Sequence, residues 1–143
     1  MKEMFSAVSL VLYFLIGVIS LAMAYKSLFS EKFLPFHEKA SGKQWDELEG
    51  PLKLVITSLM RLGGLGFLSI SILLIAGPIV NYFNPNIFYK FLIPGIALLY
   101  CTGLFLNNYI LFKKTKARTP WKGSLYAAMA ILAGMIISLF GDS

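Results

Sequence analysis

The chain has 143 residues, of which 57% are hydrophobic and 14% charged, whereas a soluble domain carries about 25% charged residues. So little polar surface excludes a soluble globular fold and predicts a single domain, residues 1–143, that faces lipid. The net charge of +6 comes without a basic-aromatic motif, so we expect no nucleic-acid partner. One cysteine, Cys101, and one histidine, His37, allow no intrachain disulfide and no zinc signature, and we expect neither a metal nor a cofactor.

The first predicted element is an uncharged run at residues 4–25, because a membrane-spanning helix needs about 20 apolar residues. Ala22-Met23-Ala24 resembles a signal-peptide cleavage site. However, the run exceeds the usual signal-peptide length of about 7 to 15 residues, and Glu3 cancels the charge of Lys2. We therefore expect a first span.

Residues 26–50 form the only long polar segment. Ser41 and Gln44 have the spacing of a capping box, and Trp45 and Leu48 then share one face of a short helix. This pattern predicts a helix that lies on the membrane surface, with Trp45 at the level of the headgroups.

Three further spans follow, at residues 51–76, 88–112 and 121–140. Gly77-Pro78 is expected to end the second span, and Pro94 predicts either a kink in the third span or its true start. The predicted fold class is therefore all-α, an integral membrane four-helix bundle with a short interfacial helix between the first and second spans.

Basic residues predict the orientation of the bundle. The first and third loops hold ten Lys and Arg residues, whereas the opposite side holds only Lys2 and Lys90. The positive-inside rule then places these two loops in the cytoplasm and both termini outside. The basic run from Lys113 to Lys122 would also attract anionic membrane lipids.

Each span carries small or polar residues at helical spacing. Such residues let helix backbones approach in lipid, so these stripes predict the seams of the bundle or a polar cavity within it. The stripes are Ser6, Ser9, Tyr13, Gly17, Ser20 and Ala24; Thr57, Arg61, Gly64 and Ser71; Tyr100, Gly103 and Asn107; and Gly123, Ala127, Ala130, Gly134 and Ser138.

Arg61 lies ten residues after Pro51, which is about 15 Å along a helix and near the middle of a hydrocarbon core about 30 Å thick. A guanidinium there costs at least about 2.5 kcal/mol, so it should face protein, water or an anion. No span contains an acidic residue. The polar candidates beside Arg61 are Thr57 and Ser58, one turn away, and Asn107 or Asn108 of the third span. If the first loop dips into the bundle, its acidic residues Glu38, Asp46, Glu47 and Glu49 could also reach Arg61. Arg61 is then a buried structural residue that links the first loop to the second span, a ligand-binding or catalytic residue, or a side chain that extends to the membrane surface.

His37 and Trp45 belong to the first loop. His37 is either a solvated side chain or an acid–base group beside Arg61, since it is the one residue type that titrates near neutral pH. Trp45 is expected to anchor the loop at the interface. No Gly-x-Ser-x-Gly elbow supports a hydrolase triad.

Several short motifs carry a resemblance to a known group. They are Phe36-His37, Gly42, Trp45 and Leu48, Arg61 with Gly63 and Gly64, and Thr119-Pro120-Trp121. The chain resembles small four-helix membrane proteins of bacteria and is similar to the DoxX-like group in general layout. The resemblance covers most of the chain in architecture and implies no particular activity.

These observations predict a membrane-embedded binding or accessory protein with a polar site in the cytoplasmic leaflet. The candidate ligand-binding residues are Arg61, Asn107, Asn108, His37, Thr57 and Trp45. The ligand would be an anionic headgroup, a lipid-like molecule, or a partner membrane protein, including a second copy of the chain. The alternative is an enzyme acting on a quinone or lipid, in which Arg61 polarises an oxygen and His37 moves a proton. A transporter is less favoured, because no span contains a carboxylate and the sequence has no internal repeat.

Overall fold

The computed structural model describes residues 2–84 and 86–142, without the side chains of residues 2, 3, 5, 6, 87–89, 141 and 142. The helices are α1 (Lys2–Phe29), α2 (Pro35–Ser41), α3 (Gly50–Phe83), α4 (Ile87–Thr115) and α5 (Trp121–Asp142), with a 3-10 turn, η1 (Trp45–Glu47), between α2 and α3. The described part of the chain contains no strand. The all-α prediction is confirmed.

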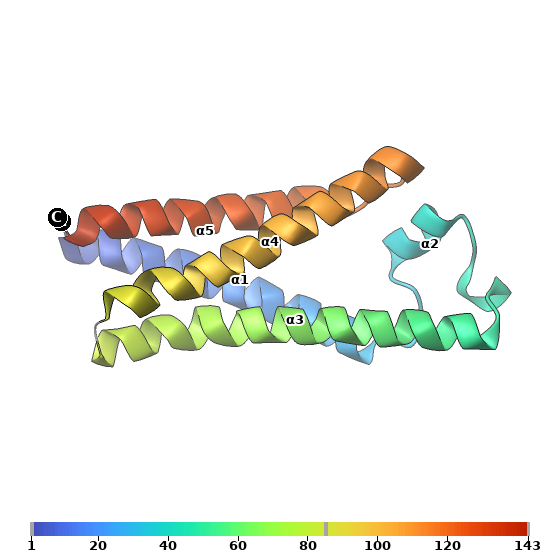
Figure 1. The fold of residues 1–143 in the computed structure, drawn as a ribbon, viewed down its shortest axis with the longest axis horizontal. Helices are drawn as coiled ribbons and strands as arrows, with labels where there is room; N and C mark the ends of the chain where they lie inside the picture. The colour runs from blue at the N-terminus through green and yellow to red at the C-terminus, as the bar shows by residue number, and fades with distance from the viewer. Residues whose placement is uncertain (1, 85, 143) are drawn as a thin grey trace.

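Four of these helices are long and apolar enough to cross a membrane, and they form the bundle in Figure 1. Their apolar spans are Ala7–Phe29, Gly50–Phe83, Lys90–Thr115 and Trp121–Phe140. A hydrocarbon core about 30 Å thick needs about 20 helical residues, so each of these spans is long enough. The predicted four-helix membrane bundle is confirmed.

The helix α1 packs against both α3 and α5, and α4 packs more extensively on α5 than on α3. Figure 1 shows why: α3 and α4 lie close together near the turn that joins them and diverge toward their other ends. The predicted stripe on α1 is confirmed for its described side chains, since Ser9, Tyr13, Gly17, Ser20 and Ala24 are buried. Ser6 lies outside the described side chains.

Close approach of α1 to its neighbours depends on small residues. A Cβ at Gly134 of α5 would lie 2.7 Å from Cε1 of Tyr13, and the Ser9 hydroxyl donates a hydrogen bond of 3.0 Å to the Gly134 carbonyl. On the other side of α1, a Cβ at Gly64 of α3 would lie 3.1 Å from the backbone nitrogen of Leu28. Backbone contact and interhelical hydrogen bonding hold helices together in lipid.

The boundaries of the spans differ from the sequence prediction. Gly77-Pro78 does not end the second span, because α3 continues through Pro78 to Phe83. Pro94 likewise lies inside α4 rather than at its start. Proline removes one helical hydrogen bond, but unwinding the helix in hydrocarbon would leave several backbone groups without partners. The helix therefore continues.

The predicted stripe on α4 is wrong in part. Gly103 and Asn107 are exposed, and α4 instead buries Pro94, Ala97 and Cys101. The predicted stripe on α5 is wrong only at Gly123, which is exposed. Gly103 and Asn107 are exposed because α3 and α4 diverge away from the turn that joins them, which leaves the C-terminal half of α4 without cover from α3 (Figure 1).

The polar segment forms two short elements instead of one interfacial helix. Gly42 adopts φ 68°, a left-handed conformation that ends α2 after Ser41. The capping box therefore begins at Gln44, whose backbone N–H donates to the Glu47 carboxylate over 3.1 Å. Ser41 is the last residue of α2 and not the N-cap that the sequence predicted.

We predict that Gly134→Leu destabilises the bundle by about 1–3 kcal/mol, because the added side chain must displace the Tyr13 ring. Thermal unfolding in a mild detergent measures the effect. Gly103→Leu is the matched control, since nothing lies within 4 Å of a Cβ at that position. Equal melting temperatures for the two variants would contradict this packing of α1 against α5.

Candidate functional site

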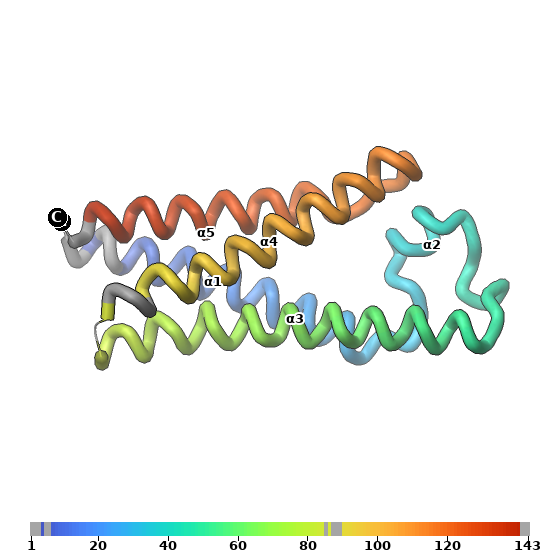
Figure 2. The backbone as a smooth tube through the Cα atoms, viewed as in Figure 1, coloured from blue at the N-terminus to red at the C-terminus, as the bar shows by residue number. Residues whose placement is uncertain are grey.

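The bundle has two chemically different ends, which Figure 2 shows at opposite sides of the view. At one, the basic end, lie α2, η1 and the α4–α5 loop. At the other, the terminal end, lie the N-terminal part of α1, the end of α3, the start of α4 and the C-terminal part of α5 (Figure 1). The sequence predicted a site at the basic end.

Arg61 does not point into the bundle, so that expectation is wrong. Its side chain is exposed, and it makes no hydrogen bond or ion pair with the described residues. Successive helical residues are about 100° apart. Around the axis of α3, Arg61 is therefore about 140° away from Gly66, the position that faces Tyr100 of α4. It is about 60° away from Gly64, the position that faces α1.

The depth expected for Arg61 also changes. The 34 residues of α3 extend about 51 Å, well beyond a core of about 30 Å. Tyr100 of α4 donates to the Gly63 carbonyl over 3.2 Å, and Trp121 packs against Tyr109, nine residues further along α4. Arg61 thus lies about 10 Å along the helix axis from the level of Trp121. This position is within the reach of a snorkelling side chain.

The other polar residues expected beside Arg61 are engaged elsewhere or face outward. The Thr57 hydroxyl donates to the Lys53 carbonyl of its own helix over 2.8 Å. Asn107 is exposed and Asn108 is half-buried. The Asn108 carbonyl accepts a hydrogen bond of 2.8 Å from the Thr119 hydroxyl, which ties the α4–α5 loop to α4. These residues do not converge on one site.

His37 and Trp45 are brought together, with Phe33 between them. The Phe33 ring lies 5.7 Å from the His37 ring and 5.1 Å from the Trp45 ring, between centroids. The His37 Nδ1 atom is buried without a hydrogen-bond partner, and burial lowers the pKa of His37 below its usual value of 6.5. His37 is therefore a neutral member of an aromatic cluster, placed on α2.

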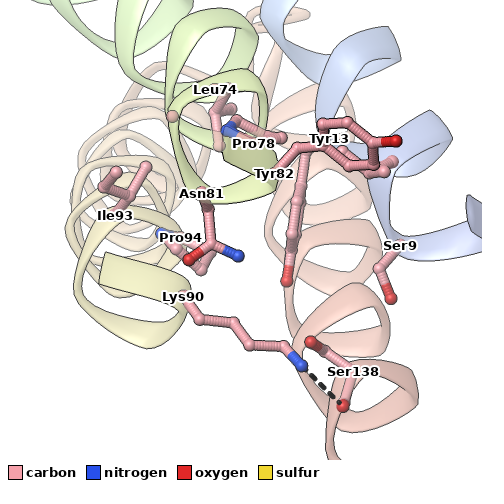
Figure 3. Close-up of a pocket in the computed structure, with 12 residues that line it drawn as sticks. Ser9, Tyr13, Leu74, Pro78, Asn81, Tyr82, Lys90, Ile93, Pro94 and Ser138 are labelled. Atoms are coloured by element: carbon pink, nitrogen blue, oxygen red, sulfur yellow. Dashed lines mark hydrogen bonds between the residues drawn. The ribbon is translucent and has the colours of Figure 1, made fainter. Parts of the chain in front are cut away.

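A polar cavity lies at the terminal end, where all four spans meet (Figure 3). It has a volume of about 80 Å³. Its lining comprises Ser9, Leu10 and Tyr13 of α1; Leu74, Gly77, Pro78, Asn81 and Tyr82 of α3; Lys90, Ile93 and Pro94 of α4; and Ser138 of α5. Among these described residues, Lys90 carries a positive charge and none carries a carboxylate.

Two prolines explain why polar groups gather there. Proline has no N–H, so Pro78 provides no helical donor for the Leu74 carbonyl, and Pro94 provides none for the Lys90 carbonyl. All four residues line the cavity. In lipid, carbonyls left in this way take partners from neighbouring helices, side chains or water. Each proline thus removes one helical donor from the carbonyl of a residue that lines the cavity.

Side chains add further hydrogen-bonding groups. Figure 3 shows Lys90 extending from α4 to α5, where its ammonium donates to the Ser138 carbonyl over 3.3 Å. Asn81 Oδ1 accepts from the Asn86 backbone N–H over 3.0 Å. The Tyr13 hydroxyl is buried without a hydrogen-bond partner, which costs about 1–3 kcal/mol. This hydroxyl belongs to a residue that lines the cavity.

The sequence contained a signal for this cavity that sequence reasoning missed. Asn81 lies one turn after Pro78, and Lys90 lies one turn before Pro94, on either side of the α3–α4 turn. Helical spacing puts each polar residue on the same face as its proline. The orientation rule uses only the charge of Lys90, and Pro78 in a helical pattern predicts only a helix end.

Comparison of the chain with protein-family models, with curated proteins and with solved structures gave no match. The resemblance to the DoxX-like group stays a prediction.

The burial of His37 predicts a pH dependence at the basic end. Because its pKa is lowered in the folded state, neutral His37 stabilises the α2–η1 segment above pH 6.5, and that contribution is lost as the pH falls below this value. Hydrogen exchange, expressed as protection factors at pH 7 and pH 5, should show lost protection over residues 35–48. His37→Phe keeps a ring but cannot titrate and should not show this loss. Equal losses in both proteins would contradict the assignment to His37.

Proposed function

We propose that the protein is a membrane-embedded binding protein whose cavity at the terminal end holds the anionic headgroup of a lipid-like molecule. The observation that carries this proposal is the Lys90 ammonium at a cavity built by all four spans. The proposal keeps the class of ligand that the sequence suggested and moves the site from the Arg61 region to the terminal end.

Charge and position support this assignment. Lys90 belongs to the apolar span of α4, and ionisable residues within membrane spans commonly mark binding sites or transport pathways. The hydrogen bond from the Lys90 ammonium to the Ser138 carbonyl, over 3.3 Å, keeps this positive charge at the cavity. The lining described above has no carboxylate that would favour a cation instead.

The size of the cavity favours a headgroup over a whole molecule. A cavity of about 150 Å³ admits benzene, and this cavity measures about 80 Å³. It can hold a small charged group while the remainder of the ligand lies elsewhere. A lipophilic substrate enclosed for catalysis would need more space.

The enzyme alternative has less support. Catalysis by nucleophilic attack needs a base within hydrogen-bond reach of the nucleophile. The Ser9 hydroxyl at the cavity donates to the Gly134 carbonyl, and His37 lies on α2 at the other end of the bundle. Among the described residues, Arg61 and His37 make no hydrogen bond, ion pair or ring contact with each other.

We predict that Lys90→Met lowers the amount of co-purified anionic lipid on the order of tenfold, since a hydrogen bond to a charged group contributes about 1.5–3 kcal/mol and 1.4 kcal/mol is about tenfold. Native mass spectrometry of the protein in a non-ionic detergent measures the bound lipid. Lys90→Arg keeps the charge and should retain most of it.

Lys39→Met is the matched control for this experiment, because Lys39 is an exposed lysine of α2 that lies outside the cavity lining and outside the basic run from Lys113 to Lys122. It should retain the wild-type amount of lipid. If Lys90→Met and Lys39→Met retain equal amounts, the cavity is not a headgroup site.

The side of the membrane that the cavity faces is a separate prediction. The positive-inside rule places the terminal end outside the cell. In a Cys101→Ser background, a cysteine added at the C-terminus should react with an impermeant maleimide on intact cells. Labelling only after lysis would reverse the orientation and place the cavity in the cytoplasmic leaflet.

A further inference from the structure

The helix α4 carries two polar side chains that face away from the rest of the chain. Thr102 and Asn107 are exposed and belong to its apolar span, and neither side chain makes a hydrogen bond with the described residues. By contrast, the exposed described residues in the spans of α1 and α5 include no serine, threonine or asparagine. A hydroxyl or an amide within a span favours a hydrogen bond to a neighbouring helix over contact with lipid.

The same side of α4 presents a regular apolar face. Its exposed residues follow one another in alternating steps of four and three, the spacing of the positions that face a partner helix in a coiled coil. They are Leu92, Ile96, Leu99, Gly103, Leu106 and Ile110. Nothing lies within 4 Å of a Cβ at Gly103, and the buried residues Ala97 and Cys101 lie on the opposite side of the helix. Lipid can cover such a face, so its partner must be inferred from the polar side chains that flank it.

These polar side chains occupy positions that meet in a parallel pair of helices. When Gly103 takes position a of a heptad abcdefg, Thr102 is the g position before it and Asn107 is the e position after it. In a parallel pair, a g side chain lies beside the e side chain of the partner's next heptad. Copies of one chain share a membrane orientation, so two α4 helices related by a two-fold axis run parallel. Each Thr102 hydroxyl is then beside an Asn107 amide.

We propose that the protein forms a homodimer in which the outward face of α4 packs against α4 of a second copy. Thr102 of each copy donates a hydrogen bond to the Asn107 amide of the other, so the surface is complementary to itself. The divergence of α3 and α4 toward the basic end leaves this part of α4 accessible to a second bundle (Figure 1). Among the four spans, α4 also has the smallest buried share. Neither Thr102 nor Asn107 lines the polar cavity, so the dimer does not depend on the headgroup site.

Cysteine cross-linking in membranes tests which face is covered. In a Cys101→Ser background, a single cysteine introduced by Leu99→Cys or Leu106→Cys should form a disulfide between copies under mild oxidation. Both positions are d positions of the heptad, and two-fold symmetry brings each one close to its own counterpart.

Leu132→Cys is the matched control, at an exposed leucine of α5. Trp121 packs against Tyr109, Leu132 lies eleven residues after Trp121, and Leu99 lies ten residues before Tyr109. The two leucines therefore lie at a similar depth. Leu132→Cys should give much less dimer than either α4 variant, and equal yields at the three positions would contradict an interface on α4.

The polar pair is tested by the monomer–dimer equilibrium in phosphatidylcholine vesicles, measured by energy transfer between donor- and acceptor-labelled copies over a range of protein dilutions. Asn107→Leu and Thr102→Val should each weaken association on the order of tenfold, because every dimer loses two interhelical hydrogen bonds. Ser58→Ala is the control, since it removes an exposed hydroxyl from α3, and it should associate as the wild type does.

The remaining outcomes decide between a second copy and lipid. Monomers at every dilution would show that lipid covers the face of α4 and would overturn the proposal. Unchanged association in both Asn107→Leu and Thr102→Val would overturn it as well, because the polar pair would then not hold the interface. Lys90→Met should leave association unchanged, so a failure of the headgroup site and a failure of the dimer are detected separately.

Discussion

Hydrocarbon offers no partner to a backbone N–H or carbonyl, and this constraint shapes the rest of the molecule. It keeps α3 and α4 helical through Pro78 and Pro94, even though each proline removes a hydrogen bond. The affected carbonyls belong to Leu74 and Lys90, on two helices that face the same cavity. Polar groups therefore gather at the terminal end because the spans cannot unwind.

The packing of α1 determines which end of the bundle is closed. Buried small residues along α1 allow it to contact α3 on one side and α5 on the other. The Ser9 hydrogen bond to Gly134 fixes α1 against α5 beside the cavity. Toward the basic end, α3 and α4 diverge (Figure 1), and the link there is made by the α2–η1 segment, whose helix α2 contacts α4. The cavity thus forms at the end where all four spans converge.

The fold could be predicted from the sequence because span length and small-residue spacing follow from local physics. The site could not, for two reasons that particular residues illustrate. The expected depth of Arg61 assumes that the hydrocarbon core begins at Pro51. Because α3 is longer than the core is thick, Pro51 does not mark the membrane boundary, and the expected depth is wrong. Lys90 and Ser138 are 48 residues apart in the chain, and nothing in a single sequence states that their helices meet. The two prolines were the local signal for that meeting.

Photo-crosslinking tests the central claim, that the polar cavity at the terminal end holds an anionic headgroup at Lys90. Protein in membranes would be irradiated with an anionic lipid that carries a diazirine beside its headgroup, and the adducts located by peptide mass spectrometry. The account predicts adducts concentrated on the cavity lining at residues 74–82 and 90–94, and their loss in Lys90→Met. Adducts concentrated near Arg61 and Asn107, or spread evenly over the lipid-facing surface, would contradict it.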